Sequence, residues 1–229
     1  MKNLLSKRTL NKYSRQIILK DVGIIGQKKI FNSKILVVGA GGLGSPVIDL
    51  LVRAGVGFLG VIEDDKVDYS NLHRQTLYDY NDVGKYKSDV IKKKIKLIND
   101  KIKLKIFKER AKDKNLSKIL PKFDIIVDGT DNFPTKFLLN KYSLKYRKKL
   151  VIGAISKFDG HIFSFDFSQK KIPCLNCFYQ GMPSDEILNC EAEGILGPTA
   201  NVIGALQANE VLKLILGPVS YTHLTLPTK

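Results

Sequence analysis

The sequence predicts an α/β protein with a mostly parallel β-sheet and helices on both of its faces. Short apolar segments rich in β-branched residues alternate with segments of helical periodicity, and that alternation is typical of parallel sheets. The first two apolar segments enclose a glycine-rich loop and a helix, which form the opening βαβ unit of a nucleotide-binding sheet. At 229 residues, 44% of them hydrophobic, the chain is long enough for one large core and too short for two comfortable domains.

The individual elements follow from the same pattern, and their layout is Rossmann-like. Strands are expected over 34–40 and 58–65, on either side of a helix over 45–55. After residue 160 the pattern changes, and an antiparallel pair extends the sheet in the C-terminal third. The other expected elements are a helix at 85–99, a strand at 103–110, a short helix at 116–122, a buried strand at 123–132, a helix at 133–149, one or two strands at 149–167 and a helix from about 198 to 216.

The two ends of the chain are expected to differ from its middle. Residues 1–217 should form a single domain, with a helical arm over about 1–32. The peptide VSYTHLTLPT near the C-terminus resembles translated sequencing-adapter DNA, and its composition departs from the Lys- and Ile-rich chain before it. We therefore expect 218–229 to be a non-native tail, so that the native C-terminus is missing and His223 has no function.

Composition excludes several classes of protein. No segment approaches the roughly 20 uninterrupted apolar residues of a membrane helix, and the N-terminus has no signal-peptide pattern. We therefore expect a cytoplasmic protein with no membrane partner. Three cysteines agree with a reducing compartment, in which a CxxC pair indicates metal or redox chemistry more often than a disulfide.

The net charge of +16 does not by itself predict nucleic-acid binding. Lys supplies 32 of the 38 basic residues and Arg only 6, although Arg is the better bidentate reader of phosphates and bases. The Lys residues alternate with Ile and Leu, as expected for solvated faces above a buried one. We do not expect nucleic acid to be the main partner, and a basic surface that meets an acidic protein is the preferred interpretation.

The GAGGLG loop at 39–44 points to a nucleotide. Gly39, Gly41 and Gly44 give the G-x-G-x-x-G spacing that lets a phosphate chain lie against a helix N-terminus. Glu63 follows 19 residues after Gly44, where such sheets place a carboxylate on a ribose. Together they predict a site for adenosine and phosphate but do not separate NAD from ATP.

The loop after the second strand favours ATP. Asn71, Arg74 and Gln75 lie close together in DYSNLHRQT, and Lys87 opens the next helix. A hydride-transfer enzyme needs neutral surroundings for nicotinamide, whereas cations beside a phosphate chain suit phosphoryl or nucleotidyl transfer. The alternative is that Arg74 and Lys87 are two further surface cations of a basic protein.

A second acidic loop, VDGTDN, follows a buried strand. Asp128 and Asp131 could hold Mg²⁺ against a triphosphate, because hard oxygen ligands suit that ion. The alternative is an Asx turn and a helix N-cap formed by Asp131 or Asn132 before Pro134. Both roles can coexist on different residues.

The ordered set of motifs resembles one family, the adenylyltransferases that activate ubiquitin-like sulfur carriers. It includes the molybdopterin-synthase activators, which this chain resembles most, and the thiazole-biosynthesis activators, and it is related distantly to ubiquitin-activating enzymes. The resemblance covers about residues 11–217. The motifs that carry it are YSRQ, GAGGLGS, VDYSNLHRQT, VGKYKSD, DGTDN, CLNC and CEAEGILGPTANVIGALQANEVLKLILG.

The resemblance implies a homodimeric transferase of molybdenum cofactor biosynthesis. Such an enzyme uses ATP and Mg²⁺ to adenylate the C-terminal Gly-Gly carboxylate of a small ubiquitin-like sulfur-carrier protein, and it releases pyrophosphate. The residue roles that it implies are Gly41 on the phosphates, Glu63 (where the family usually has Asp) on the ribose, Asn71, Arg74, Gln75 and Lys87 around the triphosphate, Asp131 on Mg²⁺, and Arg15 on the nucleotide of the other subunit.

The cysteines fit a zinc site only in part. Cys174 and Cys177 have the spacing of a zinc half-site, and the resemblance implies a second CxxC near the C-terminus that this sequence lacks. The third cysteine, Cys190, matches a family cysteine on a loop that crosses the active site; it forms a covalent link to the carrier or is a small buried thiol. His73 and His161 are expected to pack rather than to catalyse.

Four alternatives are weighed against this function. A thiazole-pathway carrier adenylyltransferase is nearly as close in resemblance. A tRNA threonylcarbamoyladenosine dehydratase would suit the basic charge, but CLNC and the CEAEGILGP segment favour the carrier activators. An NAD-dependent oxidoreductase is disfavoured by the cations expected beside the phosphates. A non-catalytic scaffold is disfavoured because every charged position of the nucleotide site is filled.

Overall fold

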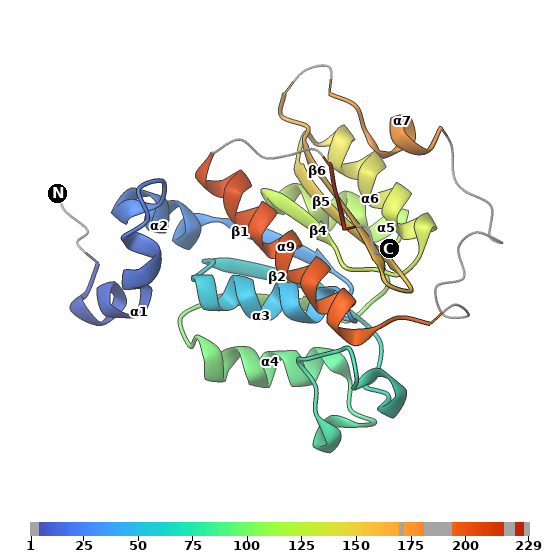
Figure 1. The fold of residues 1–229 in the computed structure, drawn as a ribbon, viewed down its shortest axis with the longest axis horizontal. Helices are drawn as coiled ribbons and strands as arrows, with labels where there is room; N and C mark the ends of the chain where they lie inside the picture. Colours follow the sequence, from blue (N-terminus) through green and yellow to red (C-terminus); the bar gives the residue numbers. More distant parts are fainter. Residues whose placement is uncertain (1–4, 170–171, 181–193, 218–222, 227–229) are drawn as a thin grey trace.

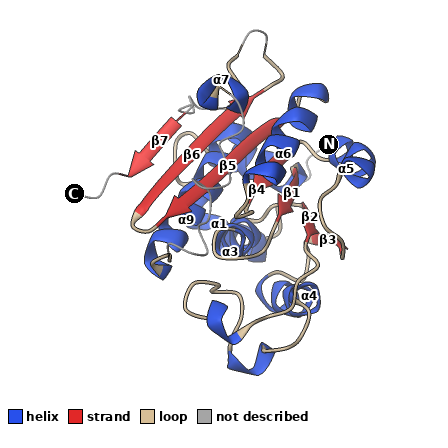
Figure 2. Cartoon of the chain, turned by 90° about the vertical axis from the view of Figure 1, so that its right-hand side faces the viewer, coloured by secondary structure: helices blue, strands red, loops and turns tan. Residues whose placement is uncertain are grey.

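A seven-stranded sheet forms the centre of the computed structural model, which describes residues 5–169, 172–180, 194–217 and 223–226 (Figures 1 and 2). The strand order is β3-β2-β1-β4-β5-β6-β7. Strands β1 to β5 are parallel, while β6 and β7 pair antiparallel, which confirms the predicted class. The strands are β1 (Lys34–Val38), β2 (Phe58–Ile62), β3 (Lys103–Phe107), β4 (Ile125–Asp128), β5 (Lys149–Ser156), β6 (Asp159–Asp166) and β7 (His223–Leu226).

Helices cover both faces of the sheet, as Figure 1 shows. Helices α3, α4 and α9 pack on one face and α5, α6 and α7 on the other, while α1 and α2 precede β1 at the N-terminal end of the described chain. The described helices are α1 (Lys7–Ile17), α2 (Gly23–Asn32), α3 (Gly44–Ala54), α4 (Lys87–Ile98), α5 (Asp113–Ile119), α6 (Phe133–Lys145), α7 (Leu175–Tyr179) and α9 (Gly197–Leu216), with 3₁₀ turns η1 (Tyr69–Asn71), η2 (Tyr80–Asp82) and η3 (Leu120–Lys122).

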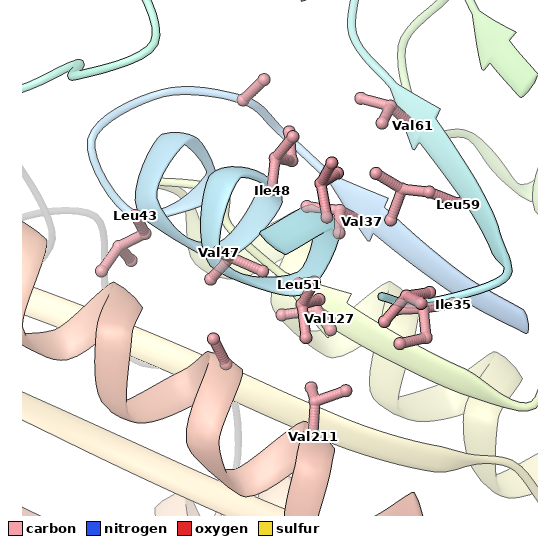
Figure 3. Close-up of a cluster of buried hydrophobic side chains, with 14 of the residues drawn as sticks. Ile35, Val37, Leu43, Val47, Ile48, Leu51, Leu59, Val61, Val127 and Val211 are labelled. Carbon is pink, nitrogen blue, oxygen red and sulfur yellow. The ribbon is translucent and has the colours of Figure 1, made fainter. Parts of the chain in front are cut away.

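The core has two layers because successive side chains of a strand point to opposite faces. In β1, Ile35 and Val37 pack beneath α3, whereas Leu36 and Val38 pack against the α5 and α6 side. Figure 3 shows the first layer, in which side chains of α3 and α9 meet those of β1, β2 and β4. Central strands that are buried on both faces explain why these segments read as continuous apolar runs.

Several boundaries differ from the sequence expectation. The helix expected over 133–149 ends at Lys145, because Arg147 adopts a left-handed backbone (φ 51°) and Lys149 already pairs in β5. The segment 149–167 forms two antiparallel strands, and Lys157, also at positive φ (52°), lies in the turn between them. Residues 223–226 pair with β6 at the sheet edge; that 218–229 is non-native stays a prediction.

A membrane-spanning element would have to be both long and apolar. Among the helices in the described part of the chain, none combines the length and the hydropathy that crossing a bilayer requires.

Truncating one side chain of the first core layer should destabilise the protein. Leu51→Ala removes a fully buried side chain between α3 and the sheet, so we expect a loss of about 2–5 kcal/mol in the free energy of unfolding. Urea denaturation measures it. Leu97→Ala is the matched control, since Leu97 is 81% exposed on α4 and its loss should change stability by no more than about 0.5 kcal/mol. Equal effects of the two substitutions would contradict the core assignment.

Candidate active site

The candidate site is a pocket of about 980 Å³ at the carboxyl ends of β1, β2, β4 and β5. Strand β1 lies between β2 and β4, so the chain turns in opposite directions on its two sides (Figure 2). In open α/β sheets ligands bind at such a topological switch point. A smaller hollow of about 520 Å³ lies at the opposite edge of the sheet, where its lining consists mainly of lysines and aliphatic side chains.

Two glycine-containing loops touch at the floor of this pocket. A Cβ on Gly44 would collide with the carbonyl oxygen of Gly39, and a Cβ on Gly129 would lie 2.8 Å from the same oxygen. Gly39 also has a positive φ (84°), which favours glycine. The loop of 39–44 and the loop after β4 therefore meet backbone to backbone, and both line the pocket.

Three side chains hold the peptide groups of Ala40 in the glycine loop. The buried Glu63 accepts the Ala40 N–H on Oε2 at 2.8 Å, and its Oε1 accepts the N–H of Asp65 at 2.9 Å. The Ala40 carbonyl accepts hydrogen bonds from the hydroxyl of Tyr78 at 3.0 Å and from that of Ser45 at 3.1 Å. Each oxygen of Glu63 keeps one lone pair for a ligand, as expected for a ribose-binding acid.

Burial, together with the nearby carboxylate of Glu63, raises the pKa of Tyr78 well above the ordinary tyrosine value. Its hydroxyl therefore stays protonated near neutral pH and keeps donating to Ala40.

Arg74 and Lys87 bring two cations to the pocket lining. Arg74 donates to Asn71 Oδ1 at 2.5 Å and to the carbonyl of Ser70 at 3.3 Å, which aims its guanidinium along the loop after β2. Lys87 is buried at the start of α4, with Nζ 3.4 Å from Asp65 Oδ2. Because Lys87 is buried and Arg74 is anchored in this loop, neither fits the alternative of a freely solvated surface cation.

Gln75 supplies a buried polar group that its neighbours leave unsatisfied. Its side chain is 4% exposed and lines the pocket, and its Oε1 has no hydrogen-bond partner among the described residues. A buried carbonyl oxygen without a partner costs free energy, so a hydrogen-bond donor of a ligand in the pocket would relieve that cost. The donors of a nucleotide suit this position.

The acidic loop after β4 divides the two predicted roles among its residues. Asp128 is fully buried, pairs with Lys136 at 2.9 Å and accepts the Thr130 N–H in an Asx turn, so it is not free to hold a metal. Asn132 caps α6 by accepting the N–H of Thr135 at 3.0 Å. Asp131 is exposed and lines the pocket, and one such carboxylate with substrate phosphates is the usual donor set for Mg²⁺.

The remaining predicted site residues lie apart from this group. Arg15 is exposed on α1, outside the pocket lining of its own chain. Cys174 and Cys177 lie at α7 with their Sγ atoms 3.7 Å apart, near the separation of about 3.8 Å that tetrahedral zinc with Zn–S bonds of about 2.3 Å gives two thiolates. Burial opposes ionisation of Cys174, but hydrogen bonds with the backbone and thiol of Cys177 lower its pKa. Cys190 lies outside the described residues.

Metal-binding groups elsewhere are few. Over the described ranges, the one cluster of three or more acidic, Cys or His side chains close enough to share an ion is Glu63, Asp64 and Asp65. Among the described residues no third Cys, His or acidic side chain lies close enough to share an ion with Cys174 and Cys177, so a zinc site at these cysteines stays a prediction.

Sequence reasoning missed several residues of the pocket and its support. Tyr78 and Lys136 carry no motif of their own, and each is identified only by the backbone group that it contacts across the fold. Arg110 follows β3 and pairs with Asp64 at 3.3 Å on the pocket rim. Asp159 and His161 of β6 also line the pocket, although His161 was expected only to pack.

Comparison with known proteins identifies the family. A family model described as "ThiF family" matches residues 13–227. The sulfur carrier protein adenylyltransferase of Thermus thermophilus is 40% identical over 216 residues, which cover 93% of this chain and 80% of that protein. A probable molybdopterin-synthase adenylyltransferase of Gracilaria tenuistipitata var. liui is 38% identical, over 93% of this chain and 59% of that protein. The adenylyltransferase and sulfurtransferase MOCS3 of Culex quinquefasciatus is 40% identical, over 94% of this chain and 50% of its own length, so the chain spans only part of these relatives.

Solved structures agree on the fold. Escherichia coli MccB in complex with MccA-N7isoASN superposes with a TM-score of 0.79 at 27% identity, over 90% of this chain and 65% of that one. PaaA superposes with a TM-score of 0.82 at 20% identity, over 99% of this chain and 72% of that one, and supports the fold alone.

Removing the hydroxyl of Tyr78 should weaken the glycine loop. Tyr78→Phe deletes the donor to the Ala40 carbonyl while keeping the buried ring, so we expect a loss of about 1 kcal/mol in the free energy of unfolding. Urea denaturation at neutral pH measures it. Tyr80→Phe is the control, because Tyr80 is 75% exposed and should change stability by less than about 0.5 kcal/mol. An unchanged midpoint for Tyr78→Phe would show that the contact does not stabilise the loop.

Proposed function

Because the chain belongs to the ThiF family, we propose that it uses ATP to adenylate the C-terminal Gly-Gly carboxylate of a ubiquitin-like sulfur-carrier protein, with release of pyrophosphate. The observation that carries this proposal is the pocket itself. It combines a glycine loop and a buried acid with Arg74, Lys87 and Asp131. Cations and a metal-type carboxylate beside the loop suit a triphosphate and its transfer rather than a nicotinamide ring.

The proposed reaction needs no general base. A carboxylate is already ionised at pH 7, so the carrier's terminal carboxylate attacks the α-phosphorus of ATP directly. The P–O bond to pyrophosphate breaks as the acyl-adenylate forms, and negative charge grows on the phosphoryl oxygens. Arg74 and Lys87 would neutralise that charge from the pocket wall. This electrostatic stabilisation of the transition state would lower the activation barrier.

The other pocket residues bind and orient the nucleotide. Glu63 would accept hydrogen bonds from the ribose hydroxyls with its two free lone pairs, and the N–H of Gly41 would face the phosphates. Asn71 anchors Arg74, and Gln75 would gain the partner it lacks. Mg²⁺ on Asp131 and the phosphate oxygens would supply positive charge to the leaving pyrophosphate.

Four finer parts of the proposal concern groups beyond this pocket. Arg15 would reach the nucleotide of the second subunit of a homodimer. Cys174 and Cys177 would provide two of the four ligands of a structural zinc. Cys190 would either link covalently to the carrier or remain a plain thiol. The basic surface of the chain would steer an acidic carrier to the pocket.

The pathway is proposed from the relatives. The Thermus relative is named for a sulfur carrier and the Gracilaria relative for molybdopterin synthase, and together these names favour a sulfur carrier of the molybdopterin-synthase type. A cytoplasmic location is part of the same proposal. A thiazole-pathway carrier differs only in the partner protein. Nothing in the names of these relatives favours tRNA dehydration or NAD-dependent oxidation.

Loss of either charged side chain should abolish the chemistry without unfolding the protein. Arg74→Ala and Asp131→Ala should each lower ATP–pyrophosphate exchange, measured with a carrier ending in Gly-Gly, by at least about 100-fold. Arg53→Ala is the control, because Arg53 is exposed and pairs with Asp49 on α3. Near-normal exchange in either pocket variant would refute its assigned role, and exchange that requires tRNA instead of the carrier would refute the function.

Mixed dimers test whether Arg15 acts between subunits. Neither Arg15→Ala nor Asp131→Ala homodimers should catalyse exchange, but a heterodimer of the two contains one pocket with both residues intact. We expect up to about half of the wild-type activity per dimer, given one working site of two. Differently tagged subunits, purified in two steps, give verified heterodimers for the measurement. No recovery of activity would argue that Arg15 does not act in trans.

A further inference from the structure

A buried lysine ties the loop that carries Asp131 to its surroundings. Lys136 lies on α6 and is only 3% exposed in the pocket wall. Its ammonium donates to Asp128 Oδ2 at 2.9 Å, to the carbonyl of Thr130 at 2.7 Å and to the carbonyl of Gly153 at 2.6 Å. An ammonium group has three N–H donors, so this set of acceptors uses them all. Lys136 has none left for a substrate and acts through the groups it holds.

The three acceptors lie behind two different walls of the pocket. Asp128 ends β4 and Thr130 follows it in the loop, next to the glycine loop that Gly129 contacts. Gly153 belongs to β5, and residues 154–156 of the same strand line another wall. The contact with Gly153 therefore fixes the spacing between the acidic loop and β5.

Asp128 makes further hydrogen bonds besides its ion pair with Lys136. Its Oδ1 accepts the N–H and the hydroxyl of Thr130, and its carbonyl accepts the side-chain amide of Gln207 at 2.8 Å. The backbone is thus held at residues 128 and 130, one residue before the exposed Asp131. Buried charges that are paired and hydrogen-bonded in a low-dielectric interior hold geometry tightly, and the charged groups of Asp128 and Lys136 are both satisfied, although Oε1 of Gln207 has no partner among the described residues.

We propose that Lys136 is a positioning residue, which fixes Asp131 relative to the glycine loop and to β5 so that a divalent cation and ATP bind together. The inference rests on the proposed function, because it takes Asp131 as the ligand of the cation. Its effect should appear first in the mobility of the loop and in the Mg²⁺ requirement for ATP binding.

The variants separate the lost contacts from the lost charge. Lys136→Met removes all three donors but leaves the carboxylate of Asp128 buried without a cation, which can prevent folding. The double variant Asp128→Asn/Lys136→Met is neutral and removes that cost. Lys136→Arg keeps a positive charge beside Asp128 but changes the geometry of the hydrogen-bond donors. Lys141→Met is the matched control, since Lys141 lies on the same helix with its side chain 65% exposed.

Two readouts follow the loop and the cation. Hydrogen–deuterium exchange of residues 128–132 in the nucleotide-free protein should be at least about tenfold faster in the double variant, and Lys136→Arg should fall between it and wild type. Calorimetric titration of ATP at several Mg²⁺ concentrations should show that the double variant needs about tenfold more Mg²⁺ for half-saturation than wild type does. Lys141→Met should match wild type in both measurements.

The proposal is overturned if the folded double variant keeps wild-type loop protection and wild-type Mg²⁺ dependence. It is also overturned if Lys141→Met changes both as much as the double variant does. The hydrogen–deuterium exchange measurement uses no nucleotide or carrier, so its result is independent of the adenylation assay. If the double variant loses loop protection while the wild-type protein never adenylates a carrier, the proposed function is refuted but the positioning role of Lys136 is not.

Discussion

The backbone contact between two loops at the carboxyl edge of the sheet sets the geometry of everything around it. Gly39 and Gly44 close the first loop on itself, and Gly129 brings the second loop against the same carbonyl oxygen. A side chain at either junction would separate the loops by the width of a methyl group or more. The close contact holds the start of α3, the loop after β4 and the end of β2 around one hollow, so cations and acids from distant parts of the chain share it.

Several buried polar and charged side chains lie at this carboxyl edge of the sheet. Glu63, Gln75 and Lys87 lie buried where β2 and the following loop leave the sheet, and Asp128 and Lys136 lie buried where β4 does. Both layers of the core beneath them are apolar. Burying charges is costly unless they are paired and hydrogen-bonded, so a fold selected for stability alone would place apolar residues here. Asp82 and Glu210 are also buried, but most of the buried charged side chains of the described residues lie at this edge, which supports the proposal that the hollow binds a charged ligand.

Sequence reasoning succeeded where a property is local. The glycine loop is predictable because its spacing fixes a backbone shape, and the parallel sheet because strands buried on both faces read as apolar runs. It failed where a residue's role depends on a distant partner. Lys136 is one of 32 lysines, and only the fold places the carbonyl of Gly153 beside its ammonium. The end of α6 was misplaced for a similar reason, since pairing in β5 draws in residues that would otherwise continue the helix.

Glu63 shows how a departure from the expected residue can be accommodated by its surroundings. A shorter aspartate reaches less far from the end of β2, whereas the extra methylene lets the carboxylate of Glu63 meet the N–H of Ala40 at 2.8 Å. The same carboxylate turns back to the N–H of Asp65, so its two oxygens are fixed before any ligand enters. Two neutral N–H donors leave the charge of the group intact and half of its acceptor capacity unused. The longer side chain therefore adds a bond to the glycine loop and still presents an acid to the pocket, and the loop and the acid are positioned as one unit.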